Sequence, residues 1–444
     1  ADDVVRLEIL DGASLDIGGL SGQVLNVVTG SEGGISGRYR YSPEIRTDHV
    51  PVRWGDGAIA LSGGKQGTEW TLSLENEQRR FGSEGPEFVT NGSGLLLDER
   101  EERVTEIFDA PSLSGSLTRE QDNGNVLNLT GALGWFLFEF DERSRRSPIE
   151  GSAGVRELRQ TEDEFGFEVG ADYAFQLGAG RLKLIGLYGF EDSPSEAQVD
   201  FNFVSGQTPQ GSFFQREADE AESVLRAEYT FAALDGDWQW SLEGARNYLD
   251  IEAALSVRDS SGTLVSAELP GASSRVEEDR AEMTLSYSRA LTERVAFQAS
   301  LGAEYSQINQ SGEFGQTRDF VRPKGFVSFN WSATDTLDVS LQIDRSVGQL
   351  NFSDVIATVN VNQDRVNVTN ANLVPPQSWL VDLQLQQSLG DLGSLTLGGY
   401  YEDISDIVDL IPIDNGASGG SVLGQAPGNI DSSKRYGGSL VATL

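Results

Sequence analysis

Few side chains in this sequence could carry chemistry, and most classes of reactive site are absent. Cysteine does not occur, and His49 and Met283 are the only residues of their types. Thiolate catalysis, disulfide bonds and zinc sites built from Cys or several His residues are therefore excluded. His49 lies in a short polar segment beside Asp48 and Arg53, where a solvated histidine is a simpler interpretation than a general base without a partner. We expect a protein that is not an enzyme and has no cofactor.

Carboxylates are abundant and occur in short runs between the apolar segments. With 33 Lys and Arg against 69 Asp and Glu, the net charge is −36, which disfavours binding to nucleic acid. The runs lie at 98–102, 162–164, 217–220 and 277–279. Carboxylate oxygens are ligands for Ca²⁺, but none of these runs has the spacing of a dedicated calcium loop. A solvated acidic surface is favoured, a divalent-ion role stays open, and no metal ligand is assigned.

Alternation of apolar and polar residues is the main structural signal. Leu337, Val339, Leu341 and Ile343 alternate with polar residues, which is the period of a β-strand with one apolar face. The same period recurs along the chain. No run of about 18 apolar residues, the length of a transmembrane helix, is present. The sequence therefore predicts an all-β protein.

The pattern predicts sixteen strands from residue 34 onward, and the connections between them alternate in length. The strands are expected at 34–42, 52–64, 67–80, 110–120, 124–140, 161–176, 180–191, 220–234, 237–250, 277–290, 293–308, 317–332, 335–348, 377–389, 392–412 and 430–444. Long polar connections are expected at 81–109, 141–160, 192–219, 251–276, 349–376 and 413–429. Tight turns on one side and long loops on the other indicate an antiparallel transmembrane β-barrel of the outer-membrane type. A large soluble β-structure is the alternative.

Aromatic residues gather beside the short connections, as in an aromatic belt at a membrane interface. Trp70, Trp238, Trp240 and Trp331 each lie within about five residues of a predicted tight turn, and we assign them to that belt. In hydrocarbon the sheet must pair all its backbone groups. The apolar set of each strand should then face lipid and the polar set the lumen.

Residues 1–33 do not follow the strand rhythm. They read Val4-Val-Arg-Leu-Glu-Ile-Leu-Asp-Gly12, a glycine-rich bend, and Gln23-Val-Leu-Asn-Val-Val-Thr29. This segment resembles the C-terminal end of the plug domain of TonB-dependent outer-membrane receptors. It matches the family motif at Arg6, Glu8, Gly12, Gly22, Asn26, Val28 and Thr29, and departs from it at Val5, Asp11, Ala13 and Ile17. The resemblance implies a plug remnant inside the barrel, with Arg6 and Glu8 as contacts to the barrel wall.

Three later segments are similar to the same family, in the family's order. Asn370-Ala-Asn-Leu-Val-Pro375 resembles the opening of a late barrel strand, and Tyr401-Glu-Asp-Ile-Ser-Asp-Ile-Val408 resembles a strand end. Asn429-Ile-Asp431, followed by Tyr436-Gly437, resembles a further strand. With the strand rhythm, the resemblance covers nearly the whole chain.

The resemblance implies the function and the location. It predicts active import of a scarce solute, of the siderophore, cobalamin or oligosaccharide type, across the outer membrane of a Gram-negative bacterium. The implied partners are the TonB energy-transducing protein, reached through a segment outside this sequence, the outer-membrane lipid and the small solute. The sequence does not select the solute or the residues that contact it.

Family members have a fuller plug and a longer barrel. We therefore expect a fragment with the end of a plug at 1–33 and a truncated barrel at 34–444, holding about 16 of the family's 22 strands. A passive porin of sixteen strands is the alternative function. The plug-like segment argues against that alternative.

Overall fold

The computed structural model describes residues 4–11, 23–29, 34–46, 49–269, 271–312, 315–355, 358–360, 365–367, 370, 372–414 and 423–443. These residues are almost wholly β, with short 3₁₀ turns at η2 (Phe352–Val355) and η3 (Gly390–Leu392). Within the described ranges no helix has the length and apolar character needed to cross a membrane. The all-β prediction is confirmed.

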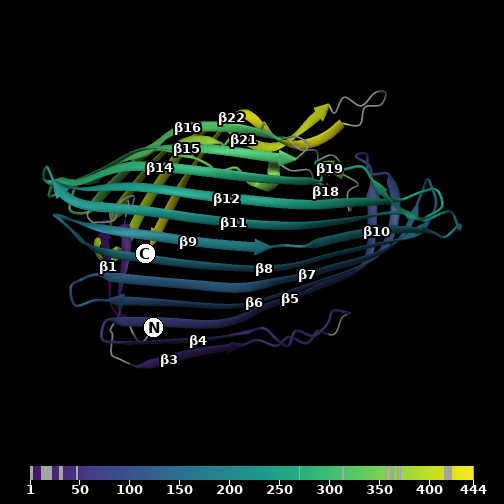
Figure 1. Cartoon of the computed structure of the whole chain (residues 1–444), viewed down its shortest axis with the longest axis horizontal. Helices are drawn as coiled ribbons and strands as arrows, with labels where there is room; N and C mark the ends of the chain where they lie inside the picture. The colour runs from purple at the N-terminus through teal and green to yellow at the C-terminus, as the bar shows by residue number, and fades with distance from the viewer. Residues whose placement is uncertain are drawn as a thin grey trace.

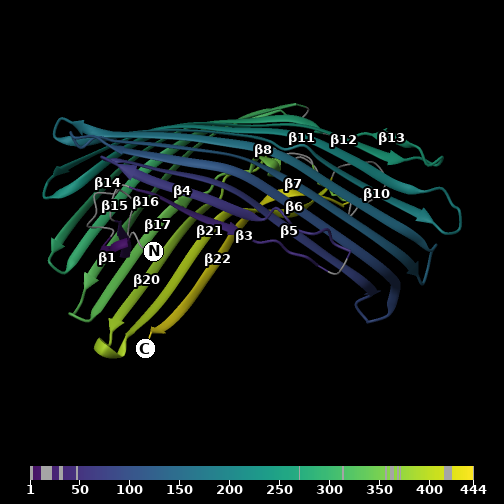
Figure 2. The ribbon, with the colours of Figure 1, turned by 90° about the horizontal axis from the view of Figure 1, so that it is seen from below.

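Twenty strands form one large sheet (Figure 1). In chain order they are β3 (Ile35–Tyr41), β4 (Gly57–Lys65), β5 (Thr68–Thr90), β6 (Leu96–Glu120), β7 (Val126–Pro148), β8 (Gly154–Leu177), β9 (Gly180–Asp192), β10 (Ser195–Phe203), β11 (Gln210–Ala233), β12 (Gly236–Arg258), β13 (Leu264–Ala267), β14 (Ser273–Thr292), β15 (Val295–Gly312), β16 (Gln316–Ser332), β17 (Leu337–Val347), β18 (Thr358–Asn360), β19 (Arg365–Asn367), β20 (Gln377–Ser388), β21 (Ser394–Asp414) and β22 (Leu423–Thr443). The sheet curves like part of a barrel wall (Figure 2).

Each of the sixteen expected ranges overlaps one strand of this wall. The other strands of the sheet are short. β10 continues the line of β9, because both pair antiparallel with β8 and with β11. β13 pairs with the far end of β12, whose remaining length pairs with β14. The positions of the main wall strands along the chain were therefore predictable from the alternation.

Four of the predicted long loops are wrong, because the strands continue through them. β5 and β6 are 23 and 25 residues long and stay paired as far as Thr90 and Leu96, so most of 81–109 is sheet. The segments 141–160, 192–219 and 251–276 are likewise largely strand. Cross-strand ion pairs satisfy their charged residues, for example Arg100 with Glu87 at 3.0 Å. Polarity indicated loops here, whereas the polar residues lie on paired strands, and Leu158, Val199, Phe214 and Leu255 of these segments form a buried apolar cluster.

The two faces of the wall differ sharply in composition. Directly opposed residues share a face, and one such row runs through Tyr287, Ala299, Val327, Ile343, Val381 and Tyr401. The next rows on this apolar face are also mainly Leu, Val and aromatic residues. The polar face carries the alternate residues, and its side chains are crowded: Gln298, Ser306 and Ser328 are nearly inaccessible to solvent. Such crowding is expected on the concave side of a curved sheet.

The N-terminal strands form a separate small sheet. β1 (Val4–Asp11) pairs antiparallel with β2 (Gln23–Thr29), with Glu8 opposite Asn26. Among the residues the structure describes, β1 does not join the wall as an edge strand. Gly12 and Gly22 lie outside the described residues. The plug assignment and the contacts of Arg6 and Glu8 with the wall stay predictions.

Candidate functional site

A row of charged residues crosses the middle of the polar face. Glu243, Glu282, Glu304 and Arg322 stand directly opposite one another on β12, β14, β15 and β16. Adjacent carboxylates on neighbouring strands repel each other. Lys324 on β16 relieves this repulsion, since its ammonium group pairs with both Glu282 and Glu304, the latter at 3.0 Å. The three side chains thus form one bridge across three strands.

Two arginines extend this charged network toward β11. Arg280 lies 3.2 Å from one carboxylate oxygen of Glu243, and Arg226 lies 3.6 Å from the other. Arg226 also pairs with Glu228 at 2.8 Å. Because Glu243, Glu282 and Glu304 each pair with a cation, the network suits a polar, water-containing lumen and would be costly facing hydrocarbon.

The connection between β17 and β20 folds onto the same polar face. Leu350, Phe352 and Leu373 of this connection belong to one buried cluster with wall residues of β11, β12, β14 and β15, namely Ala218, Leu249, Ile251, Val276 and Ile308. Val276 and Leu373 are fully buried. A long polar loop was predicted at 349–376, and its packing against the wall through Leu350, Phe352 and Leu373 was not predicted. The packed segment narrows the space in front of the polar face.

Three segments singled out in the sequence meet at this connection. The side-chain oxygen of Asn429 accepts from the N–H of Val374 at 2.9 Å, and its amide nitrogen donates to the Val374 carbonyl at 2.9 Å. The same amide donates to the carbonyl of Asp406 at 2.7 Å. Asn370 donates to the carbonyl of Pro427 at 2.7 Å. The motifs at 370–375, 401–408 and 429–431 therefore form one hydrogen-bonded junction.

Neither a protein-family model nor a curated protein matches this chain. Solved structures do. The copper transporter OprC is 14% identical with a TM-score of 0.55, covering 98% of this chain and 63% of its own. The hemophore receptor HasR of Serratia marcescens is 11% identical (TM-score 0.52; 100% and 68% covered), and the siderophore receptor PiuA of Acinetobacter baumannii 12% identical (TM-score 0.50; 99% and 66% covered).

The wall has the fold of TonB-dependent outer-membrane receptor barrels. This is the fold that the sequence predicted. The chain spans 63% of the length of OprC. At these identities the likeness establishes the receptor-barrel fold and does not extend to a substrate.

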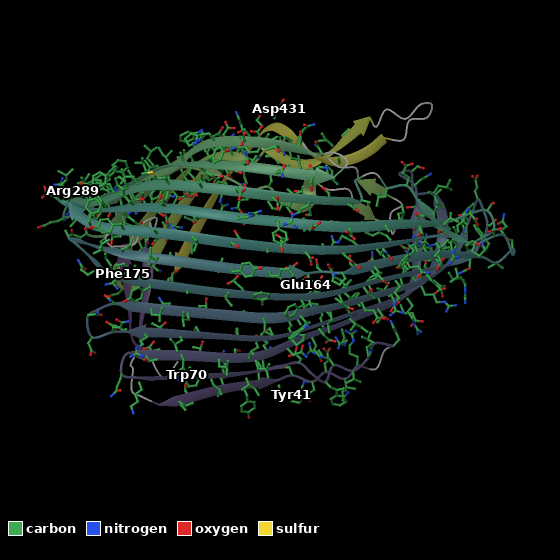
Figure 3. All side chains as sticks on the ribbon, in the orientation of Figure 1. Tyr41, Trp70, Glu164, Phe175, Arg289 and Asp431 are labelled. Carbon is green, nitrogen blue, oxygen red and sulfur yellow. The ribbon has the colours of Figure 1, made fainter. Side chains whose placement is uncertain are left out.

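The aromatics assigned to the membrane interface lie on the apolar face of the wall, near its tight turns. The ring centroids of Trp238 and Tyr287 lie 4.7 Å apart with the rings tilted by 42°, and the indole N–H of Trp238 donates to the carbonyl of Ala233 at 3.0 Å. Trp240 and Trp331 are each 50% exposed, and Trp70 lies toward the same end of the sheet (Figure 3). Aromatic rings that lie on an apolar surface, with their own polar atoms hydrogen-bonded to nearby turns, are typical of an interfacial belt. The belt itself stays a prediction.

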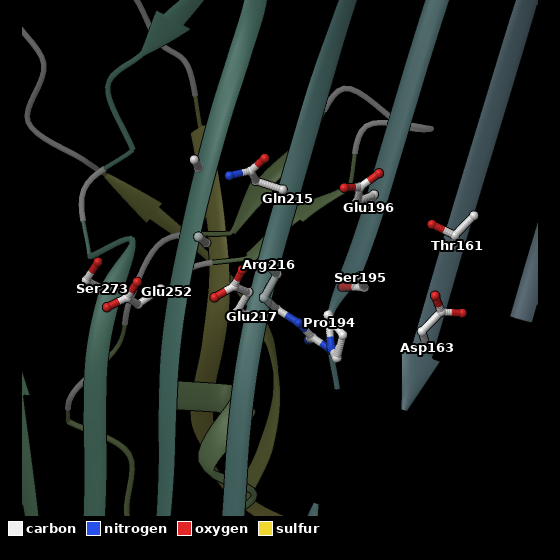
Figure 4. Close-up of a pocket in the computed structure, with 12 residues that line it drawn as sticks. Thr161, Asp163, Pro194, Ser195, Glu196, Gln215, Arg216, Glu217, Glu252 and Ser273 are labelled. Carbon is white, nitrogen blue, oxygen red and sulfur yellow. The ribbon is translucent and has the colours of Figure 1, made fainter. Parts of the chain in front are cut away.

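Two of the four acidic runs, 162–164 and 217–220, contribute to an open hollow in the wall. A cavity of about 420 Å³ lies between β8, β10, β11 and β12 and is lined by Asp163, Glu196, Glu217 and Glu252 (Figure 4). Among the described residues, no group of three His, Cys, Asp or Glu side chains is placed to hold a metal ion.

The prediction of a solvated His49 is wrong. Its side chain is 13% exposed, and one ring nitrogen lies 3.6 Å from Glu84. The other lies 2.9 Å from the Val104 carbonyl, so the histidine packs against the β5–β6 hairpin.

Hydrogen bonds from side chains stabilise the hairpin tip between β12 and β13. The alternation of apolar and polar residues did not predict these bonds. At the β12–β13 tip the hydroxyl of Ser261 and the backbone N–H groups of Thr263 and Ser261 donate to Asp259. These bonds lower the pKa of the Asp259 carboxyl from its ordinary value. Next to the tip, a 2.6 Å hydrogen bond to Asp200 raises the pKa of the Arg258 guanidinium.

Proposed function

We propose that this chain forms part of the wall of a TonB-dependent importer of a scarce solute in the Gram-negative outer membrane. The observation that carries the proposal is the pairing of a continuous apolar face with a charged, hydrogen-bonded polar face along the same strands. Such a wall separates lipid from a polar passage. An open polar passage would leak solutes, so a separate element must obstruct it. The plug-like segment at 1–33 is the candidate for that element.

The implied partners follow from this arrangement. Lipid contacts the apolar face, the solute passes along the polar face, and TonB supplies energy through a segment outside this sequence. Structures with this fold include a copper transporter, a hemophore receptor and a siderophore receptor. Copper, heme and ferric siderophores are therefore the first solutes to test, with cobalamin and oligosaccharides following. The charged network around Lys324, Glu282 and Glu304 supports a polar rather than an apolar solute path.

Uptake by the full-length gene product tests the proposal. Cells carrying the gene should accumulate one labelled solute of the panel, and accumulation should stop when TonB is deleted. Uptake that continues without TonB would replace the importer by the passive porin. If the migration of the protein in detergent gels did not change on heating, both the importer and the porin would be contradicted, because each requires a barrel.

Epitope tags test the orientation of the wall. We propose that the long hairpins are extracellular and the tight turns periplasmic. A tag at Gly92, within the turn Asn91–Leu95, or at Ser205 should be reachable on whole cells. A tag at Asp235 should be reachable only after the outer membrane is opened. The opposite result reverses the orientation.

A further inference from the structure

Two neighbouring arginines on the polar face of β16 have no carboxylate partner among the residues that the structure describes. Arg318 and Arg322 lie on either side of Phe320, and all three side chains share this face because side chains alternate along a strand. The two guanidinium carbons lie 5.5 and 5.2 Å from the centroid of the Phe320 ring. Arg280 on the same face, by contrast, pairs with Glu243 at 3.2 Å.

Arg322 is the more deeply buried of the two. It is 9% exposed, and its Nε has no hydrogen-bond partner. Glu304 stands directly opposite on β15, but its carboxylate is held by Lys324 at 3.0 Å. Glu304 and Asp406 attract the guanidinium through space, yet within the described ranges neither forms an ion pair with it. A buried charge without a counter-ion is costly, so this position favours an anion.

Arg318 is held in place without being neutralised. Its guanidinium donates to the carbonyl of Leu373 in the connection between β17 and β20, and that acceptor carries no net charge. Phe320, between the two arginines, packs against the buried cluster that contains Leu373. Both cations are therefore positioned before any ligand arrives, which lowers the entropic cost of binding. The N–H groups of a guanidinium match the oxygen atoms of carboxylates and phosphates.

We propose that Arg322, together with Arg318, binds a carboxylate or phosphate group of the imported solute. The anion would neutralise the charge that the protein leaves unpaired. Lys324 does not compete for this anion, because it is engaged by Glu282 and Glu304. The assignment to the solute rests on the proposed function, whereas the anion site itself does not.

Urea unfolding of the full-length protein in detergent, with inorganic phosphate as the probe, tests the anion site. Arg322→Gln removes the charge, and Arg38→Gln, at an exposed position of β3, is the control. Without phosphate, Arg322→Gln should unfold at a higher urea concentration than the unmodified protein, because it removes an unpaired buried charge. With phosphate at constant ionic strength, the unfolding midpoint of the unmodified protein and of Arg38→Gln should rise and saturate. Arg322→Gln should lack this saturable rise.

Two results of this assay would overturn the proposal. A lower midpoint for Arg322→Gln without phosphate would mean that the guanidinium is paired within the protein. A saturable phosphate response that persists in Arg322→Gln would place the anion elsewhere. A change of gel migration on heating confirms that each variant is folded, and an Arg322→Gln protein that does not fold counts as the first of these results.

Uptake distinguishes a group of the solute from a free ion. Two ferric complexes of similar size are compared, one with free carboxylates and one neutral. Uptake of the carboxylate complex should be the greater, and Arg322→Gln should lower it about tenfold, whereas Arg38→Gln should not. Equal uptake of both complexes would assign the site to a free anion and overturn its assignment to the solute. A protein that binds phosphate through Arg322 but imports no solute contradicts only the proposed function.

Discussion

The two faces of β15 show opposite relations between polarity and exposure. On the polar face Gln298 and Glu304 are 2% and 8% exposed, whereas Leu301 on the apolar face is 74% exposed. A soluble sheet buries its apolar side and exposes its polar side. This reversal indicates that the medium in contact with the apolar face is itself apolar. The polar face instead gains its stability from paired charges and hydrogen bonds.

The largest expected effect comes from placing the same charge on either face of β17. Leu341 stands between Phe329 and Leu383 on the apolar face, so Leu341→Arg should cost ~2–4 kcal/mol if that face meets hydrocarbon. Gln342→Arg places the charge on the polar face and should fold normally. Urea unfolding in lipid vesicles measures both. Equal stability of the two variants would contradict the assignment of the apolar face to hydrocarbon.

Removing Lys324 tests whether charge pairing stabilises the polar face. Lys324→Met leaves Glu282 and Glu304 without their shared cation, so we expect a loss of about 1–3 kcal/mol in the same unfolding assay. Lys65→Met, at an exposed position next to a tight turn, is the control and should change little. A variant as stable as the unmodified protein would show that the network is solvated and not stabilising.

A smaller effect is expected at the junction of the three motifs. Asn429→Ala removes two hydrogen bonds to Val374 and one to Asp406, and should cost ~1–2 kcal/mol. Limited proteolysis should then cut more readily between 349 and 376. Asn123→Ala, which removes a single bond in a tight turn, is the comparison. Unchanged cleavage of Asn429→Ala would mean that apolar packing alone holds the connection.

The smallest effect is expected at the tip of the β12–β13 hairpin, where Asp259 is exposed. Because the folded-state pKa of Asp259 is depressed, its turn is stabilised above the ordinary pKa and loses this support as pH falls through the folded value. At neutral pH, Asp259→Ala should speed hydrogen exchange at the amides of Ser261 and Thr263. At a pH below both pKa values the variant and the unmodified protein should agree. A difference that persists in acid would assign the effect to packing.

The strand pattern was predictable because alternation depends only on local residue type. Leu337, Val339, Leu341 and Ile343 give the same period whether or not their neighbours are known. The long hairpins were not predicted, since polar residues occur in loops and in solvated strands alike. The turn signal Asn91-Gly-Ser-Gly94 was present, and it marks the tip of the β5–β6 hairpin.

The candidate site could not be predicted from the sequence, because it depends on register between strands. Lys324 and Glu282 are 42 positions apart, and no local pattern places one opposite the other. The family resemblance did identify Asn370 and Asn429, but as separate segments. Their contact became visible only in the structure. The positions of the interface tryptophans near tight turns agree with the sequence, while their role at a membrane is untested.

The junction at Asn429 also constrains the order of assembly. Val374 and Asn429 are 55 residues apart, and Asn429 lies on β22. The connection between β17 and β20 therefore lacks this anchor until β22 has joined β21. Contacts of such sequence separation form slowly, because the intervening chain must first be ordered. We expect the passage in front of the polar face to reach its final width only after the strands that enclose it are in place.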